Sequence, residues 1–590
     1  MAPLRGSYFA SVEAASTSPV SPSPVDADVA GHRSKRDFQI GLAAILCIAL
    51  GASMLMQNVG WAQMSFFGLT RAMSTGTAQI DPYHWESKDK SYIDGHFYSV
   101  KAPGLSAFVL PAYVGLRAVH FQSRHGGRPV TGMVGPQAGS HGKPVAVKGD
   151  WHRNWTIIWA LTLFGCMLPF ALLLLLVRAM AERYGPGTGT ATAVAVGLGS
   201  MLLPFSTQLM SHSLSTFALF ASFWILHRER QGVGTLKLVA LGGLVSGLAV
   251  TVEYPLAFGG FVLGLYTAFR SADGRWDLLA VLKRGLTFAG GVLVGVLPIA
   301  LYNLWAFGSP TKMSYSAAVA VEGLTGHQEI GLNSHGFFGI GVPKFENLVH
   351  LLLSPRGLLI TTPVLAMGLF GAVIMYRKGH RAEGATIIGM VALHLLYNAG
   401  YWLPFGGGTP GPRFLIPTIP FVGIGLVFAW KKLPSTTLVL AVASGVMMGL
   451  ITVTYPLVGF DWVYRWWSRV ENAYFVPTVW SEIGLGRAWP SILPTLGLFA
   501  LAALLAAAVT RGLRFAKDWR PALAVLAGWG LLAGVASRHI REDARPADSF
   551  HVNIPHRLVG VAGLAALVAL GAALAFQRSR SVDSEGTLSE

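Results

Sequence analysis

Residues 153–178 read RNWTIIWALTLFGCMLPFALLLLLVR, an apolar run whose charged residues lie only at its two ends. A run of this length is too long for a strand or a typical core helix, whereas about 20 apolar residues in a helix cross the roughly 30 Å hydrocarbon layer of a bilayer. In lipid, a helix also satisfies all of its own backbone hydrogen bonds. The stretch therefore predicts a membrane-spanning helix.

Similar runs recur along the whole chain, and they decide the fold class. The 590 residues are 52% hydrophobic and only 12% charged, whereas soluble domains carry about 25% charged residues. The sequence predicts an all-α polytopic membrane protein with about fourteen spanning helices, near residues 38–57, 153–178, 187–205, 207–226, 235–252, 254–269, 285–306, 357–376, 384–403, 412–430, 436–457, 490–510, 521–537 and 557–576.

The positive charges predict the orientation of these helices. Lys and Arg collect in alternate short loops, as expected on the cytoplasmic side of a membrane. The clusters are Arg178 and Arg183, Arg228 and Arg230, Arg275, Lys283 and Arg284, Arg377, Lys378 and Arg381, Lys431 and Lys432, Arg511 and Arg514, and Arg578 and Arg580. The net charge of +17 is therefore explained by topology, and it does not indicate nucleic acid binding. Both termini are expected in the cytoplasm of a plasma-membrane protein.

The domain organisation follows from this orientation. Residues 1–37 predict a disordered cytoplasmic tail, 38–576 the transmembrane domain and 577–590 a second cytoplasmic tail. The long loops then all face outward, which predicts extracytoplasmic chemistry; they are residues 58–152, 307–356, 458–489 and 538–556. The run 103–121 breaks the alternation, so we expect an outer juxtamembrane helix there; if it spans, residues 122–152 become cytoplasmic.

The first of these loops is unusually rich in acids and aromatic residues. Residues 80–104 read IDPYHWESKDKSYIDGHFYSVKAPG, with four acidic side chains in a short stretch. One interpretation is a solvated loop whose Trp and Tyr side chains lie in the interfacial aromatic belt. The order of the residues favours a second interpretation.

In that order the sequence resembles the GT-C superfamily of membrane glycosyltransferases, notably bacterial relatives of protein O-mannosyltransferases and of the lipid A aminoarabinose transferase. The resemblance covers most of the membrane region and consists of an acidic first outer loop followed by residues 101–104 (KAPG), after residues 95–98 (GHFY). Three later segments also resemble the family: residues 303–310 (NLWAFGSP), 354–358 (SPRGL) and 411–417 (GPRFLIP). Where the family pattern places Asp before the Lys, this chain has Val100.

The resemblance implies a GT-C-like bundle that transfers a sugar from a polyprenyl phosphate carrier, with inversion, to a cell-envelope glycan, lipid or protein. The expected catalytic base is Asp81, then Asp89, then Glu86, because the family's base lies in this loop and the acceptor must approach it from water.

Cations at headgroup depth would bind the lipid phosphate. We expect Lys101, Arg413 and Arg356 in this role, and Tyr98 and Glu253 among the residues that bind sugar or phosphate. The competing interpretations are a snorkelling lysine, arginines that anchor helix ends, and a glutamate that pairs structurally within the bundle.

Cofactors and rival functions are less defined by the sequence. No cofactor is certain, and the loop acids could bind a divalent cation, although their spacing does not show it. The expected partners are the polyprenyl-phosphate sugar donor, the envelope acceptor and the lipid bilayer, without nucleic acid. The main alternative function is a transporter or flippase of lipid-linked saccharide, which also needs many helices and buried charges.

Overall fold

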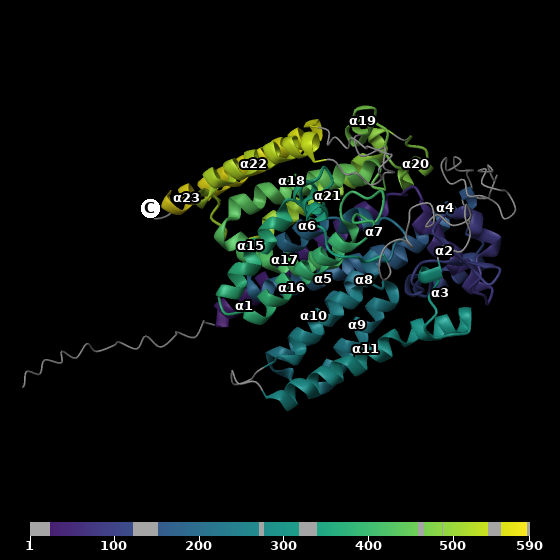
Figure 1. Cartoon of the computed structure of the whole chain (residues 1–590). Helices are drawn as coiled ribbons and strands as arrows, with labels where there is room; N and C mark the ends of the chain where they lie inside the picture. Colours follow the sequence, from purple (N-terminus) through teal and green to yellow (C-terminus); the bar gives the residue numbers. More distant parts are fainter. Residues whose placement is uncertain are drawn as a thin grey trace, which may run out of the picture.

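The computed structural model describes residues 24–121, 151–270, 277–317, 339–457, 465–486, 488–540 and 556–586. Apart from one short two-stranded sheet, the regular structure of these residues is helical (Figure 1). The chain is an all-α polytopic membrane protein, and the predicted fold class is confirmed.

The first half of the chain contains eleven helices within the described residues. They are α1 (Pro24–Ser53), α2 (Trp61–Ser74), α3 (Gly104–Ala118), α4 (Trp151–Thr162), α5 (Leu168–Tyr184), α6 (Gly189–Leu198), α7 (Leu202–Ser206), α8 (His212–Arg228), α9 (Leu236–Val252), α10 (Leu256–Ala268) and α11 (Leu278–Phe307). Shorter elements of this half are the 3₁₀ helix η1 (Asp81–Glu86), strands β1 (Lys90–Ile93) and β2 (His96–Ser99), and the π-helical segments η2 (Leu163–Met167) and η3 (Glu229–Val233).

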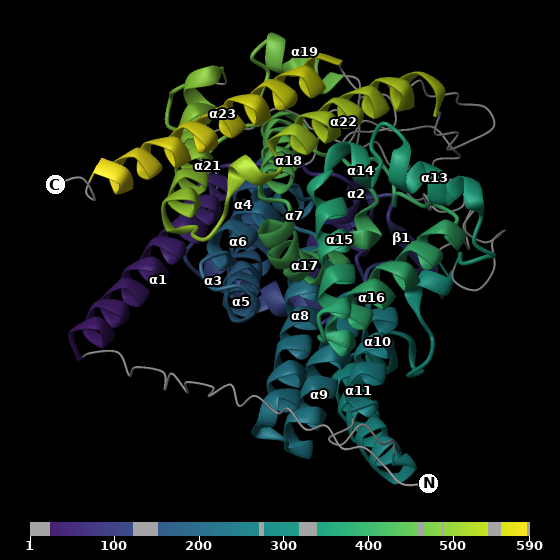
Figure 2. The same cartoon turned by 90° about the vertical axis from the view of Figure 1, so that its left-hand side faces the viewer.

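The second half continues with further helices among the described residues, several of which pack against α17 or α18. They are α13 (Phe345–Leu353), α14 (Leu358–Thr361), α15 (Val364–Arg377), α16 (Arg381–Gly400), α17 (Ile419–Lys432), α18 (Pro434–Thr454), α19 (Arg465–Glu471), α20 (Val479–Glu482), α21 (Trp489–Val509), α22 (Trp519–His539) and α23 (His556–Gly586). The 3₁₀ segments are η4 (Ser314–Ala317), η6 (Arg413–Thr418) and η7 (Phe515–Lys517). Figure 2 shows α22 and α23 side by side across α18.

Every predicted apolar run contains a helix, but the count of fourteen spans is not confirmed. Among the described residues, seven helices are long and apolar enough to cross a membrane, or eight if the bent pair Phe345–Thr361 and Val364–Arg377 is one span. The seven are Lys35–Ser53, Trp155–Tyr184, Leu278–Phe307, Arg413–Lys432, Pro434–Thr454, Trp489–Val509 and Arg557–Ser579. The other runs form shorter or less apolar helices, and run 187–205 breaks into α6 and α7.

The first long loop has more structure than the sequence indicates. Helix α2 lies in it and was not expected, because its apolar residues are interrupted by polar ones. Run 103–121 forms α3, whose 15 residues cover roughly 22 Å at 1.5 Å per residue, less than the hydrocarbon thickness. Helix α1 begins at Pro24, within the tail predicted to be disordered.

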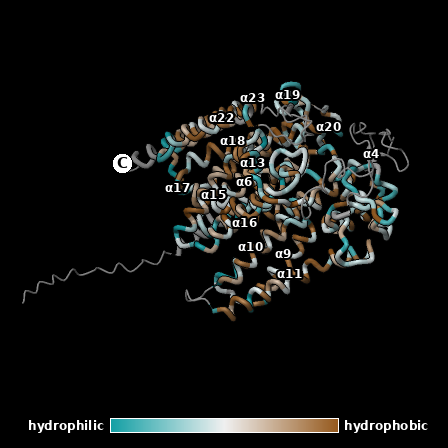
Figure 3. The backbone as a smooth tube through the Cα atoms, viewed as in Figure 1, coloured by the Kyte–Doolittle hydropathy of each residue, from teal (hydrophilic) through white to brown (hydrophobic). Residues whose placement is uncertain are grey.

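Glycines allow the closest helix contacts of the bundle. A Cβ added to Gly371 on α15 would overlap the carbonyl oxygen of Gly425 on α17, and one on Gly243 of α9 would overlap that of Phe288 on α11. Small residues of this kind let membrane helices approach until their backbones touch. In Figure 3, hydrophobic residues extend along α9, α10 and α11, consistent with lipid-facing surfaces.

Candidate functional site

A short β-hairpin positions two of the predicted site residues. Strands β1 and β2 pair antiparallel with Lys90 opposite Ser99 and Ile93 opposite His96. The turn residues Asp94 and Gly95 have positive φ angles of 50° and 87°, and Asp-Gly is a favoured sequence for a two-residue hairpin turn. This pairing brings the residue before β1 close to the segment that follows β2.

Asp89 and Lys101 form an ion pair at this open end of the hairpin. The Lys101 Nζ lies 2.6 Å from the Asp89 Oδ2, and the two side chains are 17% and 19% exposed. The backbone is held at both residues: Ser65 Oγ of α2 donates to the Asp89 carbonyl, and the Lys101 N–H donates to Ser99 Oγ at 3.1 Å. The carboxylate and the ammonium are therefore preorganised and still reachable from outside.

The two other predicted bases have different surroundings. Glu86 is buried and accepts two hydrogen bonds from the Arg71 guanidinium of α2. Asp81 is more exposed and accepts from the Phe97 N–H at 2.7 Å, while its other oxygen lies 2.8 Å from His96 Nδ1. Glu86 thus ties η1 to α2, and Asp81 ties η1 to β2.

A second lysine of the hairpin is fully buried. Lys90 donates to the His84 carbonyl at 2.8 Å, and its ammonium lies 5.2 Å from the Phe97 ring centroid. Burial, with the charge of Lys88, lowers the pKa of Lys90 to about 8. Burial, with the charge of Lys90, lowers the pKa of His84 to about 4.

Glu253 lies at the break between α9 and α10, buried with polar partners. His212 Nδ1 lies 2.9 Å from its Oε1, and Ser215 Oγ donates to its Oε2 at 2.8 Å. An acid at this depth needs such partners. Gly104 of α3 packs against this same helix end, since a Cβ there would lie 2.5 Å from the Thr251 carbonyl oxygen. The KAPG segment thereby connects the hairpin to the end of α9.

Arg413, the first residue of η6, carries a guanidinium without a carboxylate partner. Within the described part of the chain it makes no ion pair, and its buried Nε has no hydrogen-bond partner. Gly406, with a φ of +73°, leaves the space that Nε occupies, because a Cβ there would overlap it. Arg413 acts electrostatically on Glu253 and on Tyr401.

Two tyrosines connect Arg413 to the hairpin. The hydroxyl groups of Tyr315 and Tyr401 are hydrogen-bonded to each other. Val100, which precedes Lys101, packs against Tyr315 and Trp402. The charges of Asp89 and Arg413 both act on the Tyr401 hydroxyl. The Asp89 carboxylate and the Arg413 guanidinium therefore both lie within electrostatic range of Tyr401.

The side chains of Arg356 and Tyr98 both make their contacts inside the protein. Arg356 is buried, donates to the carbonyls of Gly407 and Thr409 at 2.7 and 3.1 Å, and lies 4.2 Å from the Phe405 ring centroid. It therefore holds the glycine-rich loop that precedes Arg413. Tyr98 is buried in an apolar cluster and packs edge-on against Phe307.

Of the predicted residues, Asp89 and Arg413 both act electrostatically on Tyr401, Lys101 pairs with Asp89, and Arg413 also acts on Glu253. Sequence reasoning missed Tyr315 and Tyr401, because isolated tyrosines near helix ends have the pattern of interfacial anchors. His212, which was not among the predicted site residues, pairs with Glu253. Among the described residues no three His, Cys, Asp or Glu side chains could hold a metal ion together, and the divalent cation stays a prediction.

Comparisons with known proteins add little to this geometry. No family model matches the sequence, and no curated protein matches it. Among solved structures, the chain is similar to the apo form of the oligosaccharyltransferase of Archaeoglobus fulgidus, at 13% identity and a TM-score of 0.34. The match covers 87% of this chain, which spans only 60% of that chain. A TM-score this low establishes no shared fold.

Proposed function

We propose that this protein is a glycosyltransferase that takes its sugar from a polyprenyl phosphate carrier and transfers it to an extracytoplasmic acceptor. The observation that supports this most directly is the Arg413 guanidinium, which pairs with no acid of the described chain. It acts electrostatically on the same Tyr401 hydroxyl as Asp89, the partner of Lys101. A guanidinium with free donors suits a phosphate group, which it binds through two parallel hydrogen bonds.

The chemistry of transfer matches this set of charges. The acceptor hydroxyl attacks the anomeric carbon, the bond from that carbon to the phosphate oxygen breaks, and the hydroxyl proton moves to a carboxylate. The leaving polyprenyl phosphate gains negative charge, which fixed cations stabilise in a region of reduced dielectric. Lys101 and Arg413 supply the cations, and Asp89 accepts the proton.

Asp89 suits the role of base better than the other two acids. Glu86 is committed to Arg71 and buried, so an acceptor cannot reach it. Asp81 is accessible but bonded to the hairpin backbone and to His96. Asp89 alone of the three is paired with Lys101, whose ammonium can turn toward the phosphate when the donor binds. The Asp89 carboxylate then accepts the proton of the acceptor hydroxyl.

The test uses the full chain in lipid nanodiscs with radiolabelled polyprenyl monophosphate sugars and a panel of envelope glycan acceptors. Asp89→Asn should lower transfer by about two orders of magnitude, within the range for loss of a general base. The matched control is Asp94→Asn, which removes an exposed acid of the same hairpin that pairs with Lys312 at 2.8 Å. Equal transfer by both variants would refute the assignment of Asp89.

A transporter or flippase of lipid-linked saccharide is the second candidate, and two observations favour it. The pair Phe345–Thr361 and Val364–Arg377 is bent by 93°, and Glu253 is buried at a helix break. Broken helices with buried charges are typical of transporters. Movement of a lipid-linked saccharide across vesicles without any glycosidic product would favour this candidate over the transferase.

A further inference from the structure

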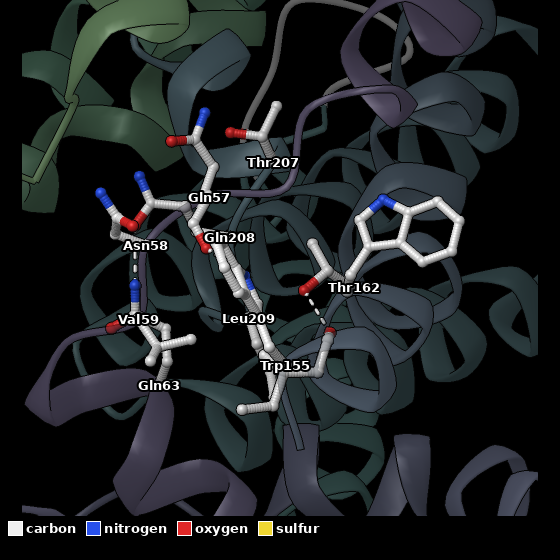
Figure 4. A pocket seen from close by; sticks show the side chains of 11 residues that line it. Gln57, Asn58, Val59, Gln63, Trp155, Thr162, Thr207, Gln208 and Leu209 are labelled. Atoms are coloured by element: carbon white, nitrogen blue, oxygen red, sulfur yellow. Dashed lines mark hydrogen bonds between the residues drawn. The ribbon is translucent and has the colours of Figure 1, made fainter. Parts of the chain in front are cut away.

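A small pocket lined in part by polar side chains takes no part in the chemistry proposed above. It lies between the segment joining α1 to α2, residues 155–162 of α4 and the segment joining α7 to α8 (Figure 4). Its polar lining consists mainly of amides and indoles: Gln57, Asn58, Gln63, Gln208, Trp155 and Trp159. No lining residue carries a charge, so the pocket does not suit a phosphate or a carboxylate.

Three of the four amides are fixed by the protein. Gln63 Nε2 donates to Gln208 Oε1 at 2.8 Å, and Gln63 Oε1 accepts from the Gly60 N–H at 3.0 Å. Gln57 Nε2 donates to the Thr452 carbonyl at 2.9 Å. This last bond also settles the orientation of the Gln57 amide, because the flipped amide would place two acceptor oxygens against each other.

The fixed amides leave one donor group and one acceptor unused. Gln57 is 7% exposed, and its Oε1 is buried without a hydrogen-bond partner in the described chain. Asn58, next along the chain, makes no side-chain hydrogen bond with any described residue. A buried acceptor without a partner costs free energy unless a ligand or water supplies a donor. The Gln57 acceptor and the Asn58 amide donor both belong to the pocket lining, and an acceptor with a donor is the complement of a hydroxyl group.

The indoles add a surface that suits a sugar ring. The Trp155 and Trp159 Nε1–H groups donate to the carbonyls of Gln57 and Ser53 at 3.0 and 2.9 Å. Both rings are therefore held in place and half-buried at the pocket. Rigid aromatic faces next to neutral amides combine an apolar surface with hydroxyl recognition, the two properties that a neutral carbohydrate presents.

We infer that this pocket is a binding subsite for a neutral saccharide. The enclosed space is small, so one hydroxyl or hydroxymethyl group enters and bonds Gln57 Oε1 and the Asn58 amide, while the ring lies at the mouth against the indoles. Its use as the acceptor subsite rests on the proposed transferase function. Two shared elements support that use: α2 carries Gln63 and also Ser65, which holds Asp89, and the segment of Gln208 continues to His212.

Binding is tested on the full chain in nanodiscs, since alkyl glycoside detergents would themselves compete for the subsite. Saturation-transfer NMR is recorded with methyl glycosides of neutral hexoses and pentoses, and with methyl glucuronide as the charged comparison. We expect transfer to at least one neutral glycoside and none to the glucuronide. Asn58→Ala should weaken binding about fivefold, the loss of one net hydrogen bond. Asn472→Ala, at an exposed asparagine directly after α19 that does not line the pocket, should leave binding unchanged.

Gln57→Met gives a second, near-isosteric variant, with folding checked by thermal melting. If the wild-type protein binds none of the neutral glycosides, or if Asn58→Ala binds them as well as Asn472→Ala does, the pocket holds only water and the inference is overturned.

Transfer kinetics separate this inference from the proposed function. If the subsite serves the acceptor, Asn58→Ala should raise the acceptor KM about fivefold with kcat nearly unchanged. Transfer activity with an unchanged KM would refute the acceptor role and leave the transferase intact. Glycoside binding that depends on Asn58, without any transfer, would instead refute the transferase and leave the subsite.

Discussion

Replacing Arg413 by Ala gives the sharpest test of how the phosphate is bound. Arg413 has no ion pair within the described chain and its Nε has no partner, so its loss should change the melting temperature little. A bidentate contact with phosphate consists of two charge-assisted hydrogen bonds, each contributing about 1.5–3 kcal/mol. Together they amount to about 3–6 kcal/mol, and each 1.4 kcal/mol corresponds to about tenfold.

We therefore expect kcat/KM for the lipid donor to fall roughly a hundredfold to ten-thousandfold in Arg413→Ala. Arg413→Lys keeps the positive charge but loses the planar guanidinium, so its activity should lie between that of the wild-type protein and that of Arg413→Ala. The assay is transfer from radiolabelled polyprenyl monophosphate sugar in nanodiscs. The matched control is Arg117→Ala, an exposed arginine on α3 bonded only to Tyr113 among the contacts described. Activity of Arg413→Ala within threefold of the wild-type protein would refute the phosphate contact.

Two further predictions concern the first long loop. Glu86→Gln leaves the buried Arg71 guanidinium uncompensated and should destabilise the fold by about 3–5 kcal/mol. The control Asp94→Asn removes an exposed partner of Lys312 and should cost less than about 1 kcal/mol. Equal denaturation midpoints for the two variants would contradict the structural role of Glu86. The pKa of Lys90 is lowered to about 8 in the folded protein, against a usual value of about 10.4, so the unfolded chain binds more protons between these pH values. The melting temperature should therefore increase from pH 8 to 10. Lys90→Met should lack this increase. An identical pH profile for the wild-type protein and Lys90→Met would contradict the lowered pKa of Lys90.

The helices were predictable because each depends on a long local pattern. Runs such as 153–178 or 436–457 keep their apolar character over a whole membrane thickness, and a helix is the conformation that satisfies their backbone in lipid. Breaks within a run were not predictable. The separation of α6 from α7, and the bend after Thr361, depend on how neighbouring helices pack, which the local composition does not report.

The site was predictable only where its residues lie close together in the sequence. Asp89 and Lys101 lie close in the sequence, and a hairpin with an Asp-Gly turn brings them together. Glu253 and His212 are 41 residues apart, and only the packing of α8 against α9 makes them a pair. The ion pair between Glu86 and Arg71 could not be predicted either, because Arg71 lies on helix α2, which the sequence did not indicate.

The hairpin register has a consequence for how such a loop can vary between related sequences. In a paired strand, a shift of one residue turns every side chain to the opposite face. A slip of one residue in the pairing of β1 with β2 would therefore separate the Asp89 carboxylate from the Lys101 ammonium, even with every residue unchanged. Variation that keeps this register, including residues that tolerate the positive φ angles of the turn, leaves the ion pair in place, whereas variation that slips the register removes it.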